Sequence, residues 1–180
     1  MSTDPLKYAG FWRRFAAFWL DFLVLLPLTA LVFWGSEQYR LFSLYYTAPG
    51  IFVGLFYGVY LVRRFGGTPG KLIMRLRIRK VSGEPVGYRE ALLRYAPEFL
   101  FGLVMSLALI PPLLQMTDAE YHAFSFMERS KRLVELAPGW FKPVQILQQI
   151  WIWSEFIVML TNRKRRALHD FIAGTVVVRE

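Results

Sequence analysis

Cysteine is absent from this 180-residue chain, and histidine occurs only twice. Without thiols the protein has neither a disulfide framework nor a thiolate metal site. A phosphate-binding loop is missing too, because Leu72 follows the Gly-Lys pair of Gly66–Lys71 where a Ser or Thr is required. These absences exclude disulfide, thiolate-metal and P-loop chemistry.

Charge is scarce in four long apolar stretches, which we predict to cross a membrane. They cover about residues 15–34, 41–62, 95–114 and 144–161. The first is 20 residues long with one charge, and at ~1.5 Å per residue it spans a hydrocarbon layer of ~30 Å. Hydrophobic residues make up 55% of the chain, more than a soluble domain of this length needs. The sequence predicts an all-α membrane protein, a four-span helical bundle.

The basic residues predict how this bundle is oriented. Seventeen of the 22 lysines and arginines lie in three stretches: the N-terminus to Arg14, residues 63–94, and the tail from Arg163. Because basic loops stay in the cytoplasm, we expect a multi-pass membrane protein with both termini cytoplasmic and residues 115–143 outside. The net charge of +9 then faces anionic lipid headgroups, not nucleic acid.

The segment 63–94 is predicted to be a cytoplasmic module with a small β element. Apolar and basic residues alternate in the second half of Leu72–Val81, which is typical of a strand. The β-branched stretch Gly174–Arg179 predicts a second strand, and we expect the two to pair. Tyr88–Arg94 is expected to be helical and to lead into the third span.

Two further segments have simple predictions. Gly66–Gly70 is rich in turn residues, so we expect a tight interfacial turn with Lys71 at the lipid headgroups. The outer segment, residues 117–143, is expected to form one short amphipathic helix on the outer surface.

Ionisable side chains in the apolar stretches are the first candidates for function. A carboxylate at the depth of Asp21 costs ~2.5–3.5 kcal/mol. Arg14 lies on nearly the same helix face but leans away toward the N-terminus, so Asp21 needs a partner from another segment. The expected partners are Glu155, Lys71 or Arg94. A structural ion pair and a step in a transport path are both open.

Glu155 lies about as deep in the fourth stretch as Asp21 does in the first. If the two carboxylates face each other, like-charge repulsion keeps one of them protonated, as in proton-coupled sites. The alternative is a neutral Glu155 that forms hydrogen bonds inside the bundle. Because Gln148, Gln149 and Glu155 lower the hydropathy of this stretch, a tilted or interfacial helix is an alternative to a full crossing.

The C-terminal His169-Asp170 pair does not predict hydrolase chemistry. Neighbours on a helix do not face each other, and no Ser, Thr or Cys nucleophile motif accompanies the pair. His122 is expected on the outer side, so the two histidines cannot share a metal ion. Asp170 is instead expected to contact Arg14 at the cytoplasmic boundary.

Three sequence blocks, GFWRRFAAFWLD, GGTPGKLIMRLRI and RRALHDFIAGTVVV, stand in order along the chain. With them the chain resembles the RDD family of bacterial membrane proteins, as a single domain over residues 1–180. Arg14, Ala17 and Asp21 match R-x-x-A-x-x-x-D. Gly67, Thr68, Gly70 and Lys71 match the second block, and His169 and Asp170 match L-H-D-x-x-A-G-T-x-V. The family is named for one Arg and two Asp residues, and the resemblance implies that these are Arg14, Asp21 and Asp170. The family's usual domain has fewer spans, so the fourth span and segment 117–143 are interpreted as an elaboration.

The resemblance implies a transport role, since cation/proton antiport has been suggested for the family. We expect a small transporter or ion-coupled carrier. The alternative is a non-transporting scaffold or regulator that binds a partner protein through its basic cytoplasmic face. No enzymatic activity, cofactor or metal is expected. Gly50, Gly54 and Gly58 allow close helix contact, either inside the chain or in a homo-oligomer. The candidate functional residues are Arg14, Asp21, Lys71, Glu155, His169 and Asp170.

Overall fold

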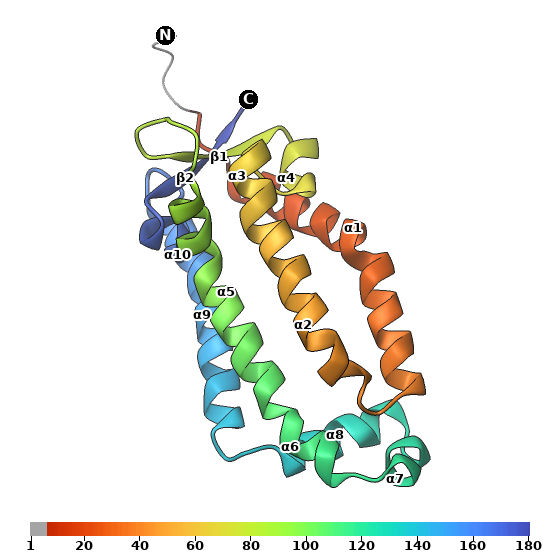
Figure 1. Cartoon of the computed structure of the whole chain (residues 1–180). Coiled ribbons are helices and arrows are strands. Elements are labelled where there is room, and N and C mark those ends of the chain that lie inside the picture. Colours follow the sequence, from red (N-terminus) through yellow and green to blue (C-terminus); the bar gives the residue numbers. More distant parts are fainter. Residues whose placement is uncertain (1–6) are drawn as a thin grey trace.

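The computed structural model describes residues 7–180, which are mostly helical with one small sheet. Three helical segments are long and apolar enough to cross a membrane: Phe11–Gln38, Phe42–Ile73 and Tyr88–Gln115. They match three of the four predicted crossings. The fourth stretch forms one helix, α9 (Phe141–Thr161), which is not among those three. In Figure 1 the long helices run side by side with both strands at one end, which we call the sheet end.

The first crossing is the single helix α1 (Phe11–Gln38). The second consists of α2 (Phe42–Leu55), a π-helical turn η1 (Phe56–Tyr60) and α3 (Leu61–Phe65), which follow one another directly. Gly66 ends α3 with a φ of 74°, the left-handed conformation that glycine adopts without strain.

The third crossing begins at the sheet end as α5 (Tyr88–Ala108). There the side chain of Glu90 accepts a hydrogen bond of 2.7 Å from the backbone N–H of Gly87. This bond satisfies one of the free N–H groups at the helix start. The helical path continues after Leu109 as α6 (Ile110–Gln115), which has a Pro in its first turn, where proline is tolerated.

Glycines bring the second crossing close to α5. A Cβ on Gly58 would lie 2.5 Å from the ring of Tyr95, and a Cβ on Gly54 would overlap the Tyr95 hydroxyl. The missing side chains therefore make room for this ring. Of the two alternatives left open by the sequence, these two glycines serve a contact inside the chain.

The predicted turn at Gly66–Gly70 is only partly present, because a short helix begins inside it. This helix is α4 (Pro69–Ile73), which packs against α1. Thr68 precedes it in an extended conformation, and Pro69 occupies its first turn, where no backbone N–H is needed. The prediction was wrong because Pro and Gly were interpreted only as turn residues.

The two predicted strands form and pair. β1 (Leu76–Lys80) runs antiparallel to β2 (Thr175–Arg179), with Ile78 opposite Val177. Leu76 and Ile78 of β1 are buried, because alternate residues of a strand point to the same face, and Val177 is buried opposite Ile78. Together with α1, η1, α3 and α5 they form the main hydrophobic core at the sheet end.

The single helix predicted for residues 117–143 is wrong. The structure has two helices there, α7 (Asp118–Ala123) and α8 (Phe126–Leu136). The hydroxyl of Thr117 accepts from the N–H of Glu120, and Ser125 and Glu128 cap each other's backbone N–H groups. A cap in mid-segment starts a new helix, and this signal was missed. Around Leu113, Met116 and Tyr121 a second hydrophobic cluster forms.

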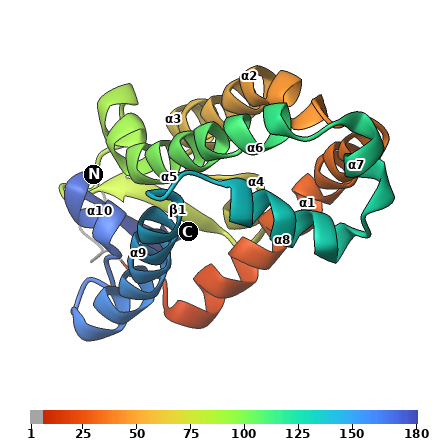
Figure 2. The same ribbon diagram turned by 90° about the horizontal axis from the view of Figure 1, so that it is seen from below.

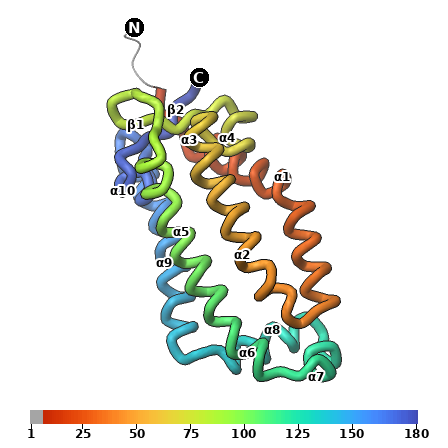
Figure 3. Tube along the Cα trace, in the orientation of Figure 1, coloured from red at the N-terminus to blue at the C-terminus, as the bar shows by residue number. Residues whose placement is uncertain are grey.

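The chain returns to the sheet end through α9 and the short helix α10 (Leu168–Ile172). Figure 2 shows the long helices as an arc that runs from α1 through α2 and α5 to α9. At the sheet end the rings of Phe11 and Phe156 are 5.9 Å apart. Away from it, α1 and α9 diverge (Figures 1 and 3). The arc is therefore closed at the sheet end and open elsewhere.

Candidate functional site

The three sequence blocks meet at the sheet end, where Asp170 is the centre of an ionic network. Asp170 is fully buried. Its carboxylate accepts a hydrogen bond of 2.9 Å from Nη1 of Arg14 and one of 3.0 Å from the hydroxyl of Thr175. Arg94 also binds this carboxylate, and the backbone N–H of Ala167 donates to it at 3.0 Å. The predicted contact of Arg14 with Asp170 is therefore confirmed.

This network joins segments that are far apart in the sequence. Arg14 comes from α1, Arg94 from α5 and Asp170 from α10. Arg166 adds a further link, because it donates to the carbonyl oxygens of Asp170 at 2.8 Å and of Thr175 at 3.0 Å. A buried carboxylate that is shared by two guanidinium groups is costly to leave with only one of them. The network therefore fixes α10 and β2 against the long helices.

Asp21 is the centre of a second cluster, on the side of α1 that faces α2 and α4. Its carboxylate accepts hydrogen bonds of 2.6 Å each from the hydroxyls of Tyr57 and Thr68 and from the backbone N–H of Gly70. Nζ of Lys71 lies 3.9 Å from Oδ2. Of the expected partners, Lys71 is thus near Asp21. Arg94 and Glu155 bind elsewhere.

Small residues allow α4 to approach α1 at this cluster. A Cβ on Gly70 would overlap the carbonyl oxygen of Ala17 and lie 2.7 Å from the backbone nitrogen of Asp21. Ala17 itself is fully buried. The first two sequence blocks therefore describe one packing unit, in which alanine and glycine make room for the hydrogen bonds to Asp21.

The side chain of Lys71, expected at the lipid headgroups, points inward to Asp21 and Thr68. Its side chain is only 21% exposed, and its Nζ is 3.3 Å from the hydroxyl of Thr68. The reason is α4, which packs on α1 and places Lys71 beside Asp21. An ammonium group in this position offsets the charge of the carboxylate.

Glu155 and His169 form a third group, from α9 and α10. Oε1 of Glu155 accepts a hydrogen bond of 2.9 Å from the backbone N–H of His169. Oε2 is 2.5 Å from Nδ1 of the ring, and a carboxylate oxygen of Glu98 is 3.7 Å from the same nitrogen. Burial lowers the pKa of His169 well below 6.5, helped by Arg94, Lys71 and Arg14. The imidazole is therefore neutral at neutral pH.

Several polar atoms of these groups have no hydrogen-bond partner. Among residues 7–180, they are Oε2 of Glu155, both ring nitrogens of His169, and Nε and Nη2 of Arg14. Oε2 and Nδ1 are close, but they are not aligned as a hydrogen bond. The carboxylates of Asp21 and Asp170 differ from that of Glu155, since each accepts several hydrogen bonds. In the Asp170 network the two unpartnered nitrogens belong to Arg14.

A cavity of about 260 Å³ lies next to these groups, between α1 and α9. Its ionisable lining residues are Arg14, Lys71, Arg94, Glu98, Glu155 and His169. The rest of its wall is mainly aromatic and aliphatic, with Phe15, Phe18 and Trp151 among the residues. Proton exchange and the binding of a small ion are chemically feasible here, because neutral imidazole and carboxylate groups meet cations in a place of low polarity.

Within the described part of the chain, no group of three or more His, Asp or Glu side chains could hold a metal ion. His122 lies in α7, at the end of the molecule opposite His169 (Figure 1).

Sequence reasoning missed Tyr57, Thr68, Arg94 and Thr175 as partners of the two aspartates. Thr68 and Thr175 belong to the matched sequence blocks, so their hydroxyls were an available signal. Arg94 was counted among the basic residues that set the orientation and was offered as a partner of Asp21. Tyr57 stands in an uncharged span, and no local pattern marks it.

The long apolar helices, the small sheet and the buried ionic network define a polytopic helical membrane protein. The chain belongs to the RDD family, whose family model matches residues 8–174, nearly the whole sequence. No curated protein and no solved structure matches it.

Proposed function

We propose that this RDD protein is a small ion-coupled carrier in which Glu155 carries the coupling proton. The pair that Glu155 forms with His169 supports this most. Polar groups in a purely structural network are normally all hydrogen-bonded, and ionisable groups at membrane depth usually serve a function. Here Oε2 of Glu155 and both ring nitrogens of His169 have no such partner among residues 7–180, and both residues line the cavity.

The geometry suggests how a proton would matter. Two unprotonated acceptors at the 2.5 Å between Oε2 and Nδ1 would repel each other, so a proton lies between them. In the form that we propose, Oε2 of Glu155 carries this proton, and the neutral imidazole of His169 has its own N–H at Nε2. Loss of this proton leaves a negative charge in a cavity that Arg14 and Arg94 also line. A cation that binds in its place would restore the balance. Exchange of a proton for a cation is therefore the mode of coupling that we propose.

Four spans fit this proposal, with α9 as the fourth. β1 precedes α5, and α5 is long enough to carry the chain across a membrane. Because β2 pairs with β1, the chain has to return to the sheet end between residues 116 and 174. α9 has 21 residues, enough at ~1.5 Å per residue for a layer of ~30 Å.

The basic residues of the sheet end support a cytoplasmic location for this end and for both termini. This corresponds to a multi-pass protein of the bacterial inner membrane, whose basic face meets anionic lipid headgroups. The proposal includes no enzymatic activity, no cofactor and no nucleic-acid partner.

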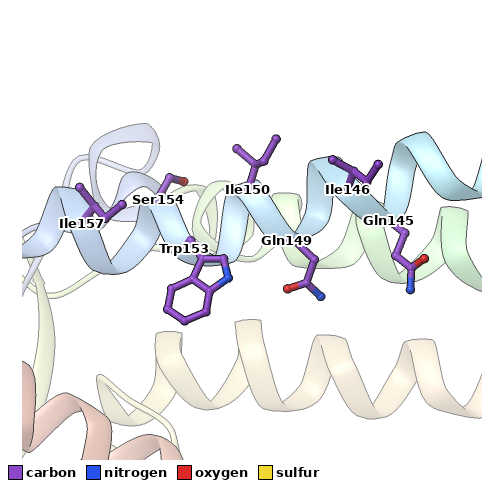
Figure 4. A pocket seen from close by; sticks show the side chains of 7 residues that line it. All are labelled: Gln145, Ile146, Gln149, Ile150, Trp153, Ser154 and Ile157. Carbon is purple, nitrogen blue, oxygen red and sulfur yellow. The ribbon is translucent and has the colours of Figure 1, made fainter.

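A homo-oligomer is part of the proposal, because one face of α9 is unoccupied. An open stretch of surface on this helix is formed by α9 residues alone, among them Gln145, Gln149 and Trp153. Figure 4 shows Gln145, Gln149 and Trp153 on one side of α9 and Ile146, Ile150 and Ser154 on the other. Amide side chains inside a membrane favour hydrogen bonds to another helix, and a second copy would provide them.

Flux in proteoliposomes tests the carrier. With an imposed pH gradient, addition of Na⁺ or K⁺ should release protons and restore the fluorescence of a pH-sensitive dye. Glu155→Gln should abolish this signal while the protein remains folded. The matched control is Glu135→Gln, in the exposed surface of α8, which should transport normally. Dye signals no greater than those of empty liposomes, or full activity of Glu155→Gln, would contradict the proposal.

The alternative is a non-transporting scaffold that binds a partner protein through the basic face of the sheet end. The three hydrogen bonds that Asp21 accepts support it, because they hold α1, η1 and α4 together. Asp21→Asn should then lower stability or partner binding, with no flux in any variant. The same flux assay therefore separates the two functions.

A further inference from the structure

Four arginines surround a depression of about 460 Å³ on the outer face of β1, away from the cavity described above. Arg63 and Arg64 come from the end of α3, and Arg77 and Arg79 come from β1. The alternation along β1 buries Leu76 and Ile78 and turns the two arginines outward. The same pattern that builds the core thus builds a basic surface.

Glu180 already places a carboxylate in this depression. Its Oε2 accepts a hydrogen bond of 2.8 Å from Nε of Arg77, and its Oε1 accepts one of 2.7 Å from Nη2 of Arg79. These bonds, with that of Arg77 as the main cause, lower the pKa of Glu180. Two adjacent oxygens of one anion are therefore held by two arginines, and a phosphate presents oxygens in the same way.

Positive charge is in excess here. Among residues 7–180, Glu180 is the only acidic residue that lines the depression beside the four arginines. Within residues 7–180, neither Arg63 nor Arg64 has a carboxylate at ion-pair distance, and Arg63 lies over the ring of Tyr88. The side chains of Arg77 and Arg79 are about one-third exposed, so a ligand can reach them. Arg77 is also held by the carbonyl oxygen of Phe65.

We propose that this depression binds the phosphate of an anionic phospholipid, and that Glu180 occupies the site until the lipid displaces it. Arg63 and Arg64 follow Val62, the end of the second apolar stretch, so the depression lies at the level of the headgroups. Phe65, which also lines it, is exposed and offers an apolar contact to the acyl region. Guanidinium groups bind phosphate in a bidentate manner. The four arginines that line the depression favour a lipid of net negative charge over a zwitterionic one, whose phosphate is balanced by its own cation.

Lipid binding to the purified protein in a neutral detergent tests this site by native mass spectrometry. Phosphatidylglycerol is compared with phosphatidylcholine of the same acyl chains. The wild type should prefer phosphatidylglycerol. Glu180→Gln should raise the affinity for phosphatidylglycerol about two- to fivefold, because the carboxylate of Glu180 no longer competes with the lipid phosphate for Arg77 and Arg79. The Arg77→Gln/Arg79→Gln double variant should bind both lipids equally. Arg89→Gln, a neighbouring exposed arginine outside the depression, should behave as wild type.

Each remaining outcome contradicts the proposal. Equal binding of both lipids by the wild type would show that the depression does not select an anionic phospholipid. An unchanged or lower affinity of Glu180→Gln would show that Glu180 does not occupy the lipid site. If inorganic phosphate binds with the same dependence on the variants and the lipid adds nothing, the ligand is a free anion. Binding of polyglutamate without a preference for phosphatidylglycerol indicates an acidic peptide. Glu180→Gln keeps the test valid if the double variant does not fold, and none of these results depends on transport.

Discussion

Asp21 and Asp170 are the two aspartates that the resemblance to the RDD family singles out, and in this structure each carboxylate binds groups from several elements. Asp21 joins α1 to η1 and α4, and Asp170 joins α10 to α1, α5 and β2. The carboxylate of Asp21 accepts three hydrogen bonds and that of Asp170 accepts four. Glu155 lies beyond these two aspartates with an unpartnered oxygen. Different residues therefore hold the helices together and line the cavity: the two aspartates do the first, and Glu155 does the second.

The Arg14–Asp170 contact should appear in a double-mutant cycle. Because removal of one partner leaves a buried charge unpaired, Arg14→Ala and Asp170→Ala should each lower the free energy of unfolding by ~3–5 kcal/mol. The double variant should lose less than the sum. The control is Asp118→Ala. The carboxylate of Asp118 is 75% exposed in its pair with Arg40, so this change should lower the free energy of unfolding by ~1 kcal/mol or less. Chemical unfolding in detergent measures all four; strict additivity would count against the contact.

Gly70→Ala should be strongly destabilising. Its Cβ would meet backbone atoms of Ala17 and Asp21, which cannot move aside as a side-chain tip can. We expect a loss of ~2 kcal/mol or more, in the range of overpacked cores. Gly102→Ala is the matched control, because a Cβ there has no atom within 4 Å and alanine favours a helix by ~0.5–1 kcal/mol. Equal stability of the two variants would show that α4 does not pack on α1 as described.

His169 should make the protein less stable in acid. Its pKa is lowered in the folded state by burial, so the unfolded chain binds the proton more readily. This contribution is fully present above about pH 6.5 and falls by up to ~1.4 kcal/mol per pH unit below it. His169→Gln should flatten the acid limb of stability against pH, whereas His122→Gln, at an exposed position, should not. Identical pH profiles of wild type and His169→Gln would refute this.

Among the elements, those with a clear period could be predicted from the sequence. The apolar runs give the three membrane-length helices, and the alternation around Leu76–Lys80 gives β1. The predictions for residues 117–143 and for Gly66–Gly70 failed for the same reason, which is that residues that start a helix were not recognised as such. Ser125 with Glu128 starts α8, and Thr68 with Pro69 starts α4. Both are helix starts placed inside segments that were interpreted as one helix or as a turn.

The contact between η1 and α5 should depend on the size of residue 58. Gly58→Ala would place a methyl group against the base of the Tyr95 ring, where Cγ lies 2.9 Å away, so stability should fall by ~1–3 kcal/mol. In a Tyr95→Ala background the same change should have little effect, because the ring is gone. Thermal unfolding in detergent of the four proteins gives the coupling. A penalty that persists without the ring would place its cause in another contact.

For the whole molecule, the sequence predicts the apolar segments and the bias of basic residues, but not which distant charges meet. Arg94 binds Asp170, 76 positions later, and such a pairing depends on how the helices pack. Periodicity and charge counts contain no information on that packing. The same limit applies to the cavity, which arises only when α9 and α10 are set beside α1. Helices and strands can thus be predicted where local sequence patterns determine them. The ion-pair network and the cavity cannot, because they depend on how distant segments pack.

The fourth crossing can be tested because the native chain has no cysteine, so single cysteines can be labelled without background. With β2 paired to β1 and α9 crossing, Ser82→Cys and Lys164→Cys should react only from the cytoplasmic side. Ser125→Cys, between α7 and α8, should react only from outside. A membrane-impermeant maleimide on intact cells and on inverted vesicles measures both sides. Labelling of position 164 from outside would mean that α9 does not return the chain, and it would contradict the pairing of the strands as well. Labelling of position 125 only from the cytoplasm would contradict the orientation that the basic residues predict.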